Sequence, residues 1–379
     1  MNKVLNLVPP LDLTRQYATI EHEVSKAVLK VLASGQYING PVVASFSKQF
    51  GDYVGAQNCV VCNSGTDALY LALRALNVGP GDEVITSPFT FIATAEAISA
   101  VGAVPVFVDI ELETFNLNPA NLESAVTERT KAIMPVHIFG QPVDMDALMA
   151  VAHRHNLPVI EDCAQATGAQ WQAKKVGSIG RVGCFSFFPT KNLGGCGDGG
   201  ALTTDDPDIA AAARLVRDHG STERYRHEVI GINSRLDAVQ AAILQIKLQY
   251  LEQWNAQRQA VAERYEQLLA PVVGVQAPKA ITQGRSVWNQ YSILLKGASA
   301  QQRDQVRSHM QDQGVATMVY YPIPLHRQPV YQSLNYSAEK LPYTEQAAAE
   351  VLALPMFPEL TAEQQEQVVY ALKNALATL

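Results

Sequence analysis

The 379-residue sequence predicts an α/β protein, with a large domain built on a mostly parallel sheet and a smaller α+β domain after it. The first observation is that short apolar runs alternate with helix-patterned stretches from residue 59 to residue 219. Such alternation is typical of right-handed crossovers whose helices cover both faces of a parallel sheet. The second observation is that the alternation stops near residue 245, inside one unusually long helical pattern.

Each element of the large domain follows from its local pattern. Two N-terminal stretches repeat apolar residues at helical spacing, and each is followed by a glycine, Gly35 or Gly55, as is common at helix C-termini. Short apolar runs predict buried strands. The predicted strands are 59–62, 83–86, 104–108, 132–138, 158–161, 182–188 and 200–204. The predicted helices are 20–34, 42–53, one opening at Ser64, 90–101, 144–155 and 207–219, and a polar, basic loop covers 219–237.

The remaining sequence predicts the second domain. A helical pattern over 236–269 ends at Pro271, and the last helix begins at Thr361 with Gln364 at the spacing of a capping box. Between them we expect strands at 288–295 and 315–321, a helix at 301–313, a loop and one further helix. We therefore expect the large domain over residues 1–245 and the small domain over residues 246–379.

Composition excludes several classes of function. Hydrophobic residues make up 47% and charged residues 17%, which is typical of a globular protein with a sizeable core. The net charge of −7, without a long basic run, argues against nucleic acid as the main partner. No stretch approaches the length of a membrane span, and residues 1–17 contain no apolar leader. We therefore expect no membrane association and a cytoplasmic location.

The cysteines and histidines do not predict a metal site. The five cysteines are an odd number, which suggests reduced thiols rather than a disulfide framework. Cys59 and Cys62 form a CxxC pair, but their odd spacing in a strand directs them to opposite faces. His153 and His155 lie two apart on a helix and do not share a face.

Lys191 follows the apolar run 182–188, which Pro189 ends, and it precedes a glycine-rich segment. An ammonium group in such an apolar setting loses hydration, which lowers its pKa and frees the amine to attack a carbonyl. The aldehyde of pyridoxal phosphate (PLP) is such a carbonyl. On this stretch alone, a surface lysine in a glycine-rich turn is the better interpretation.

Two other strand ends carry residues that suit a phosphate. Ser64, Gly65 and Thr66 open a helix, where free backbone N–H groups and a hydroxyl attract an anion. Taken alone, this motif is more often an ordinary helix N-cap. Ser186 alternates away from the phenylalanines of its strand and could donate a hydrogen bond to the same phosphate.

An acid pair, Glu161 and Asp162, ends another predicted buried strand. A carboxylate about 4 Å from a pyridinium nitrogen stabilises it by about 4 kcal/mol at an effective dielectric near 20. A solvated acidic turn is an equally good interpretation. Glu161 should point to the opposite face as a structural residue, and we expect a structural role for His137 too. At the crevice floor, we expect Phe89 to stack on a planar ring and Phe91 to pack in the core.

These motifs occur in an order that resembles one family. The chain is similar to the DegT-like group of fold-type I PLP-dependent sugar aminotransferases, which aminate nucleotide-linked keto-sugars. The resemblance implies an aspartate-aminotransferase-like large domain with a seven-stranded, largely parallel sheet. The matching motifs are GQYINGP, NSGTDAL, GPGDEVITSPFTFIATAEAI, VPVFVDI, IEDCAQATGA, CFSFFPTKNLGGCGDGGAL, INSRLDAVQAAIL and YYPIPLH.

The resemblance also implies roles for individual residues. Lys191 would bind the cofactor covalently and then carry a proton between carbons, and Asp162 would pair with the pyridine nitrogen. The resemblance implies PLP as the cofactor, or pyridoxamine phosphate (PMP) in the half-reaction, and L-glutamate as the amino donor. The expected cofactor-binding residues are Gly65, Thr66, Phe89, Asp162, Gln165, Ser186, Lys191 and, from the neighbouring subunit, Asn233. The expected substrate-binding residues are Arg235, Tyr320, His326 and Tyr37. Because Asn233 and Arg235 would cross between subunits, the resemblance implies a homodimer with shared active sites.

The motifs look most like the branch that aminates C3 of UDP-2-acetamido-3-oxo-glucuronic acid, for surface polysaccharides such as the lipopolysaccharide O-antigen. Arg224, Arg226 and Arg235 would suit an anionic uronate. Relatives in that branch often carry His in place of Tyr320, and some carry Asn in place of His326. A neutral 3-keto or 4-keto-6-deoxy sugar on dTDP or UDP is the alternative. Dehydratase relatives replace the lysine with histidine, so the presence of Lys191 argues against a dehydratase or a regulator. A binding module without PLP is a second rival, which the yellow colour of an aldimine in the purified protein would exclude.

Overall fold

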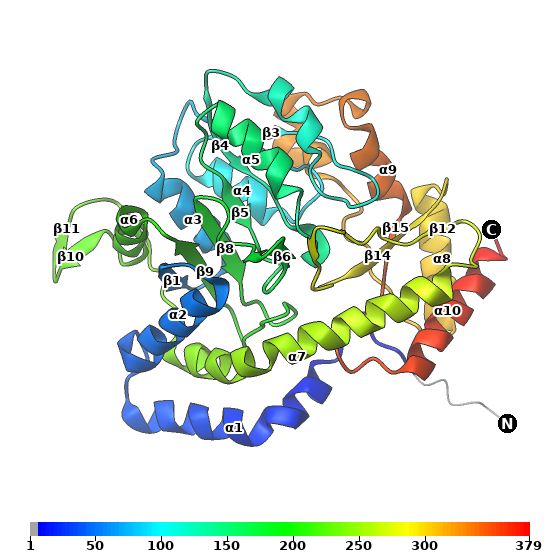
Figure 1. Ribbon diagram of the computed structural model, residues 1–379, viewed down its shortest axis with the longest axis horizontal. Helices are drawn as coiled ribbons and strands as arrows, with labels where there is room; N and C mark the ends of the chain where they lie inside the picture. Colours follow the sequence, from blue (N-terminus) through cyan, green and yellow to red (C-terminus); the bar gives the residue numbers. More distant parts are fainter. Residues whose placement is uncertain (1–6) are drawn as a thin grey trace.

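The main sheet of the protein consists of two groups of strands (Figure 1). The structure is a computed structural model that describes residues 7–379. Residues 1–6, part of the segment in which we expect no leader, lie outside the described residues. One group runs β1–β9–β8–β5 and the other β3–β2–β4, and bridges Ile133–Val159 and Val136–Asp162 connect β4 with β5. The strands are β1 (Asn58–Cys62), β2 (Glu83–Thr86), β3 (Val104–Phe107), β4 (Thr130–Met134), β5 (Ile160–Asp162), β8 (Val182–Ser186) and β9 (Gly200–Thr204).

Most neighbouring strands of these two groups are parallel, and β9 is the exception. Strand β9 runs antiparallel to both β1 and β8, whereas β2 pairs in parallel with β3 and β4, and β5 with β8. The glycine-rich segment between β8 and β9 contains no helix, so the chain turns back beside β8 instead of crossing over. As a result, the segment that contains Lys191 lies at the carboxyl end of β8.

Alternate residues of the strands pack on opposite faces of the sheet. Phe185 belongs to the core shared with helices α2 (Gly40–Val54) and α7 (Ala238–Leu269). Cys184 belongs to the core shared with α3 (Gly65–Ala75) and α6 (Pro207–Arg217). Cys59 and Cys62 divide between the same two cores, which confirms that the CxxC pair faces both ways.

Helix α7 links this sheet to a second core at the C-terminal end of the chain (Figure 1). Leu244 and Leu251 pack in the core that contains Phe185, whereas Val261 and Tyr265 pack against β14 (Tyr291–Leu295). Packing therefore changes between residues 251 and 261 of one continuous helix. A domain boundary inside this helix, expected near residue 245, stays a proposal.

The C-terminal core differs from the sequence prediction in its strands. The central strand β14 pairs with β12 (Val275–Gln276) and with β15 (Val351–Leu354). We predicted neither of these two partner strands. The predicted strand 315–321 is wrong, because this segment makes only isolated bridges, from Val315 to Val8 and from Met318 to Ala353. Strand β15 takes the place beside β14, and it follows α9 with no turn residue to mark its start. Residue 8 thus packs with the C-terminal core rather than with the large sheet.

The predicted polar loop 219–237 contains a hairpin of β10 (Ser221–Glu223) and β11 (Arg226–His227), which projects from one end of the molecule in Figure 1. The capping box of Thr361 and Gln364 is confirmed. The described residues include no helix that is long and apolar enough to cross a membrane. The other helices are α1 (Leu13–Ser34), α4 (Ala93–Ala100), α5 (Met145–Arg154), α8 (Ala300–Asp312), α9 (Pro342–Glu350) and α10 (Ala362–Leu376). The remaining short elements are β6 (Gln170–Trp171), β7 (Lys174–Lys175), β13 (Gly284–Arg285) and the 3₁₀ turns η1 (Pro119–Asn121), η2 (Glu123–Ala125), η3 (Ile138–Gly140), η4 (Leu325–Arg327), η5 (Pro329–Leu334) and η6 (Ala338–Lys340).

Candidate active site

Asp162 and Lys191 come together at the carboxyl ends of two neighbouring parallel strands. Asp162 is the last residue of β5 and pairs with Cys184 of β8, and Lys191 follows β8 in a turn where its amide donates to the Phe188 carbonyl. Burial lowers the pKa of Lys191 to about 8, and the charge of Asp162 acts in the opposite direction. A lysine of this pKa has a substantial fraction of free amine near neutral pH.

Among the described residues, the buried carboxylate of Asp162 has only neutral hydrogen-bond donors. Its side chain accepts hydrogen bonds from Thr94 Oγ1 at 2.9 Å and from the Ala164 amide at 3.1 Å. Burial raises the pKa of Asp162, although these bonds and the charge of Lys191 partly offset the rise. The Asp162 carboxylate is therefore available to form an ion pair with a cationic ring nitrogen.

The phosphate candidates also converge. Ser64 caps α3 by accepting a hydrogen bond from the Asp67 amide, so Gly65 and Thr66 stand in the first turn of the helix. Gly65 lies against Ser186, since a Cβ added to Gly65 would be 2.6 Å from Ser186 Cβ. A helix N-terminus beside a hydroxyl is a favourable site for a phosphate.

This close approach predicts a specific effect of Gly65→Ala. The added methyl group would clash with Ser186, so we expect a loss of about 1–3 kcal/mol of stability from overpacking, together with weaker binding of a phosphate ligand. Urea unfolding and titration with PMP would measure both effects. Gly79→Ala is the matched control, because its Cβ would meet no atom closer than 3.9 Å. Equal affinity for PMP in the Gly65 variant and the wild type would contradict this arrangement.

Two hydrogen bonds fix the side chain of Gln165. Its side-chain oxygen accepts from the Phe139 amide at 2.6 Å, and its nitrogen donates to the Tyr321 hydroxyl at 3.1 Å. One N–H of the Gln165 amide is not needed for these two bonds. Burial raises the pKa of Tyr321, which keeps this phenol neutral. We did not single out Tyr321 from the sequence, although it lies in the YYPIPLH motif.

The burial of the two phenylalanines is the reverse of what we expected. Phe89 is 1% exposed, with its ring packed against Phe115, Phe139 and Tyr321, so it has no open face on which another ring could stack. Phe91 is 57% exposed and lies 6.4 Å from Tyr321, measured between ring centroids. The expectation of core packing for Phe91 was wrong, because the chain between β2 and α4 turns the first ring inward and the second outward. The accessible aromatic ring is that of Phe91.

A buried asparagine network, not predicted from the sequence, holds the residues on either side of Lys191. Asn289 Nδ2 donates to the Thr190 carbonyl at 3.2 Å and to Asn192 Oδ1 at 2.8 Å. Asn192 Nδ2 donates to Asn255 Oδ1 of α7 at 2.8 Å. Asn255, a polar residue on the buried face of a long helix, was the available signal. The network ties the lysine turn to the helix that links the two cores.

Three of the expected residues are exposed or partly exposed within the chain. The Tyr37 side chain is half exposed, and its hydroxyl donates to the Leu32 carbonyl. Asn233 is exposed, and Arg235 lies 3.7 Å from Asp218. The expectation that Asn233 and Arg235 act on a neighbouring subunit stays a prediction.

The two remaining substrate candidates differ from each other. Tyr320 lines a cavity together with Thr190 and Gln290, so it borders the lysine turn. His326 is 3% exposed, and its Nε2 is 2.7 Å from a carboxylate oxygen of Glu345. A ring that is this buried has no surface for a substrate in this conformation, so the expected role of His326 is corrected to a structural one.

The lowered pKa of Lys191 predicts how stability depends on pH. Below pH 8 the folded protein keeps the Lys191 ammonium charged, although burial disfavours the charge. Between pH 8 and 10.5, the ordinary pKa of lysine, the unfolded chain binds more protons than the folded protein does. The free energy of unfolding therefore rises with pH over this range. We therefore expect Lys191→Met to stabilise the cofactor-free protein at neutral pH, with a gain that fades between pH 8 and 10.5. Melting temperatures measured across this range test it, with the exposed Lys174→Met as control. A gain that is constant over the whole range would contradict the assignment.

The chain is similar to known proteins over nearly its whole length. A family model described as the DegT/DnrJ/EryC1/StrS aminotransferase family matches residues 18–373. The "Pleiotropic regulatory protein" of Geobacillus stearothermophilus is 49% identical over 96% of this chain and 96% of its own length. The UDP-2-acetamido-2-deoxy-3-oxo-D-glucuronate aminotransferase of Pseudomonas aeruginosa is 44% identical over 96% of this chain and 99% of its own. The dTDP-3-amino-3,4,6-trideoxy-alpha-D-glucose transaminase of Streptomyces venezuelae is 42% identical over 97% and 96%.

Solved structures share the fold across nearly the whole chain. S. venezuelae DesV, in complex with a ketimine intermediate, superposes with a TM-score of 0.93 at 42% identity, covering 97% of this chain and 98% of that one. Bacillus subtilis ntda with bound cofactor PMP superposes with a TM-score of 0.91 at 33% identity, covering 99% of this chain and 86% of that one.

Proposed function

Because the family match spans residues 18–373, the chain belongs to the DegT/DnrJ/EryC1/StrS aminotransferase family, and we propose that it transfers an amino group to a nucleotide-linked keto-sugar. The protein is a PLP-dependent aminotransferase with the α/β fold of the aspartate-aminotransferase-like sugar aminotransferases. The observation that carries the proposal is the convergence of Asp162, Lys191 and the Gly65–Ser186 contact at the carboxyl ends of one sheet.

The residues at this edge fit the cofactor. Within the described residues Asp162 forms no salt bridge, which leaves its carboxylate available to a pyridinium, and the first turn of α3 with Ser186 suits a phosphate. When bound, PLP supplies an electron sink that stabilises a carbanion. Asp162 would keep the ring nitrogen protonated, and Gln165 would offer its free N–H to the ring hydroxyl. Gly65, Thr66 and Ser186 would hold the phosphate.

Lys191 would supply the amine that binds the cofactor and the base that moves the proton. Its pKa of about 8 is close to neutral pH, and such a match favours general acid–base catalysis near neutrality. The accessible Phe91, rather than the buried Phe89, is the ring that could stack on the cofactor. Asn233 of a second copy would complete the phosphate site, so the active enzyme would be a homodimer.

The best-supported acceptor is UDP-2-acetamido-3-oxo-glucuronic acid, aminated at C3 with L-glutamate as donor, in the cytoplasmic synthesis of a surface polysaccharide such as an O-antigen. Its support is the similarity to the Pseudomonas enzyme and the arginines Arg224, Arg226 and Arg235, which would suit a carboxylate and a diphosphate. A neutral keto-deoxy sugar on dTDP is the second candidate, and the similarity to the Streptomyces transaminase favours it.

A substrate panel separates the two candidates. The purified enzyme would be loaded with PMP and offered the UDP-linked 3-oxo-uronate and neutral dTDP- and UDP-linked keto-sugars, while the return of the visible PLP band is recorded. We expect the uronate to restore the band fastest. Arg235→Met should slow the uronate far more than a neutral sugar, which makes the two substrates matched controls for each other. Turnover of neutral sugars alone would reverse the assignment of substrate, and no turnover of any keto-sugar would overturn the proposed function.

A further inference from the structure

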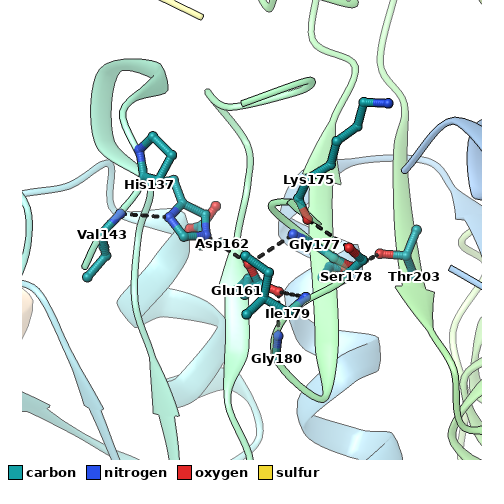
Figure 2. Close-up of polar contacts among 12 residues, drawn as sticks. His137, Val143, Glu161, Asp162, Lys175, Gly177, Ser178, Ile179, Gly180 and Thr203 are labelled. Atoms are coloured by element: carbon teal, nitrogen blue, oxygen red, sulfur yellow. Dashed lines mark hydrogen bonds and ion pairs between the residues drawn. The ribbon is translucent and has the colours of Figure 1, made fainter. Parts of the chain in front are cut away.

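Glu161 lies beside Asp162 in β5, but its carboxylate faces the opposite side of the strand and is fully buried (Figure 2). Three donors are backbone amides of one turn: Gly177 at 2.9 Å, Ile179 at 2.9 Å and Gly180 at 2.7 Å. The fourth is His137 Nε2, at 3.0 Å from Glu161 Oε2. Burial alone would raise the pKa of Glu161, but the bonds from His137 and from this turn outweigh it and lower the pKa. Glu161 is therefore a buried anion with a full set of donors.

The hydrogen bonds of His137 assign its tautomer. Nδ1 lies 3.1 Å from the Val143 amide, which can only donate, so Nδ1 accepts (Figure 2). The proton of the neutral ring must then be on Nε2, where it is donated to Glu161. His137 therefore connects the Glu161 carboxylate to the segment that begins at Val143.

The same histidine is bound to Asp162 through the backbone. The His137 amide donates to the Asp162 carbonyl at 3.0 Å, and the Asp162 amide donates to the Pro135 carbonyl at 2.9 Å. Strand β5 has only three residues, and Asp162 is its last, a position where a short strand frays unless its neighbours are anchored. The side chains of Glu161 and His137 provide that anchor on the face opposite to the site.

The turn held by Glu161 also packs against the strand that leads to Ser186. A Cβ added to Gly177 would be 2.2 Å from the Phe185 ring, and one added to Gly183 would be 2.3 Å from Gly177 Cα. Thr203 Oγ1 donates to the Gly177 carbonyl at 2.7 Å. A movement of this turn would therefore displace residues of β8 as well as of β5.

We propose that Glu161 and His137 are positioning residues, which hold the Asp162 carboxylate in the orientation that a bound PLP or PMP ring requires. The inference rests on the proposed role of Asp162 as the partner of the ring nitrogen. His137, Glu161 and Cys163 also form a possible ligand set for a metal ion, with ligand atoms within 4.8 Å of one another. Both nitrogens of His137 and both oxygens of Glu161 are already hydrogen-bonded, so the geometry favours the positioning role.

Two substitutions of His137 separate the positioning role from a general structural one. In His137→Gln, the amide nitrogen can reach the place of Nε2 and donate to Glu161, but the acceptor for Val143 is lost. In His137→Asn, the amide oxygen takes the place of Nδ1 and accepts from Val143, but the donor to Glu161 is lost. Glu161→Gln removes the charge directly. Asp109→Asn is the matched control, because Asp109 is a buried carboxylate that accepts from the Tyr343 and Thr344 amides of α9 and has no described bond to Glu161 or Asp162.

The measurement is the affinity of each purified variant for PMP by calorimetry, together with the melting temperature of the cofactor-free protein. We expect Glu161→Gln and His137→Asn to bind PMP on the order of tenfold to a hundredfold more weakly, the usual cost of disturbing a supporting hydrogen bond. His137→Gln and Asp109→Asn should bind PMP like the wild type, even where their melting temperatures fall. The pH titration of the visible band of bound PLP should shift in the first two variants and not in the last two.

Several results would overturn the proposal. Wild-type affinity in Glu161→Gln would do so, as would loss of affinity in Asp109→Asn equal to that in Glu161→Gln. If Glu161→Gln fails to fold, the His137 pair decides: weak binding by His137→Gln with wild-type binding by His137→Asn rejects the positioning role. Asp162→Asn separates the two levels of the argument. Weakened binding in Asp162→Asn alone rejects only the role of Glu161 and His137, whereas wild-type affinity in Asp162→Asn rejects the role of Asp162 as well.

Discussion

Lys191→Ala should lower the rate of amino transfer by about four orders of magnitude or more, the upper end of what a positioned acid–base group contributes. The variant loses the only lysine amine that the described structure brings to the end of β5, beside Asp162. It would also lose the proposed nucleophile for covalent binding of the cofactor, so the visible band of the purified protein should change. Steady-state turnover with L-glutamate and an absorbance spectrum of the same sample measure the two effects.

The control for this prediction is Lys174→Ala, which removes an exposed lysine from β7. It should keep wild-type turnover and the wild-type spectrum. A Lys191→Ala protein that folds, binds PLP and keeps full turnover would contradict the assignment of this lysine, and with it the proposed mechanism.

Asp162→Asn is expected to slow turnover on the order of a thousandfold. A carboxylate about 4 Å from a cation stabilises it by about 4 kcal/mol at an effective dielectric near 20, and each 1.36 kcal/mol corresponds to tenfold in rate. The neutral amide keeps the shape of the side chain but cannot hold the ring nitrogen in its charged form. Single-turnover rates with L-glutamate, recorded on PLP-loaded protein, isolate this step from product release.

Asp109→Asn tests whether loss of any buried carboxylate has the same effect, because Asp109 accepts hydrogen bonds from Thr344 and Tyr343 far along the chain. It should lower stability without a comparable loss of rate. Rates in Asp162→Asn that remain within a few-fold of wild type would show that the ring nitrogen does not depend on this acid.

Short-range pattern was enough to predict most of the large sheet. Apolar runs bounded by polar turns predicted β1, β2, β3, β8 and β9 within about two residues of their bounds, the ordinary error for element ends. The same pattern failed at β15, because a four-residue apolar run that follows a helix directly looks like more helix. The strand prediction for 315–321 was wrong because the local sequence of an extended, apolar segment does not indicate whether a partner strand lies beside it.

The site shows the same division between local and long-range information. The placement of Lys191 and Asp162 could be predicted, since Lys191 follows one buried strand, Asp162 ends another, and parallel strands end at one edge. Their roles were predicted from the resemblance to the family and not from the local pattern. Phe89 and Phe91 could not be ranked, because which ring points inward depends on Phe115, Phe139 and Tyr321, which are distant in sequence.

His326 is a further case, because its partner Glu345 lies in another helix. The asparagine network around Lys191 depends on α7 and on residues 287–289 in the same way. These contacts are set by side chains from segments far apart in the chain.

Residue order alone was sufficient for the alternation of strand and helix, the lysine beyond one strand and the acid at the end of another, because periodicity and chain reversal are local properties. Three features depend on the three-dimensional packing instead. They are the exposure of Phe91 rather than Phe89, the burial of His326 beside a carboxylate, and the hydrogen bonds of Glu161 and His137 behind Asp162. The reason is physical: burial and hydrogen-bond geometry are properties of the whole set of neighbours around a side chain, and most of those neighbours are remote in sequence.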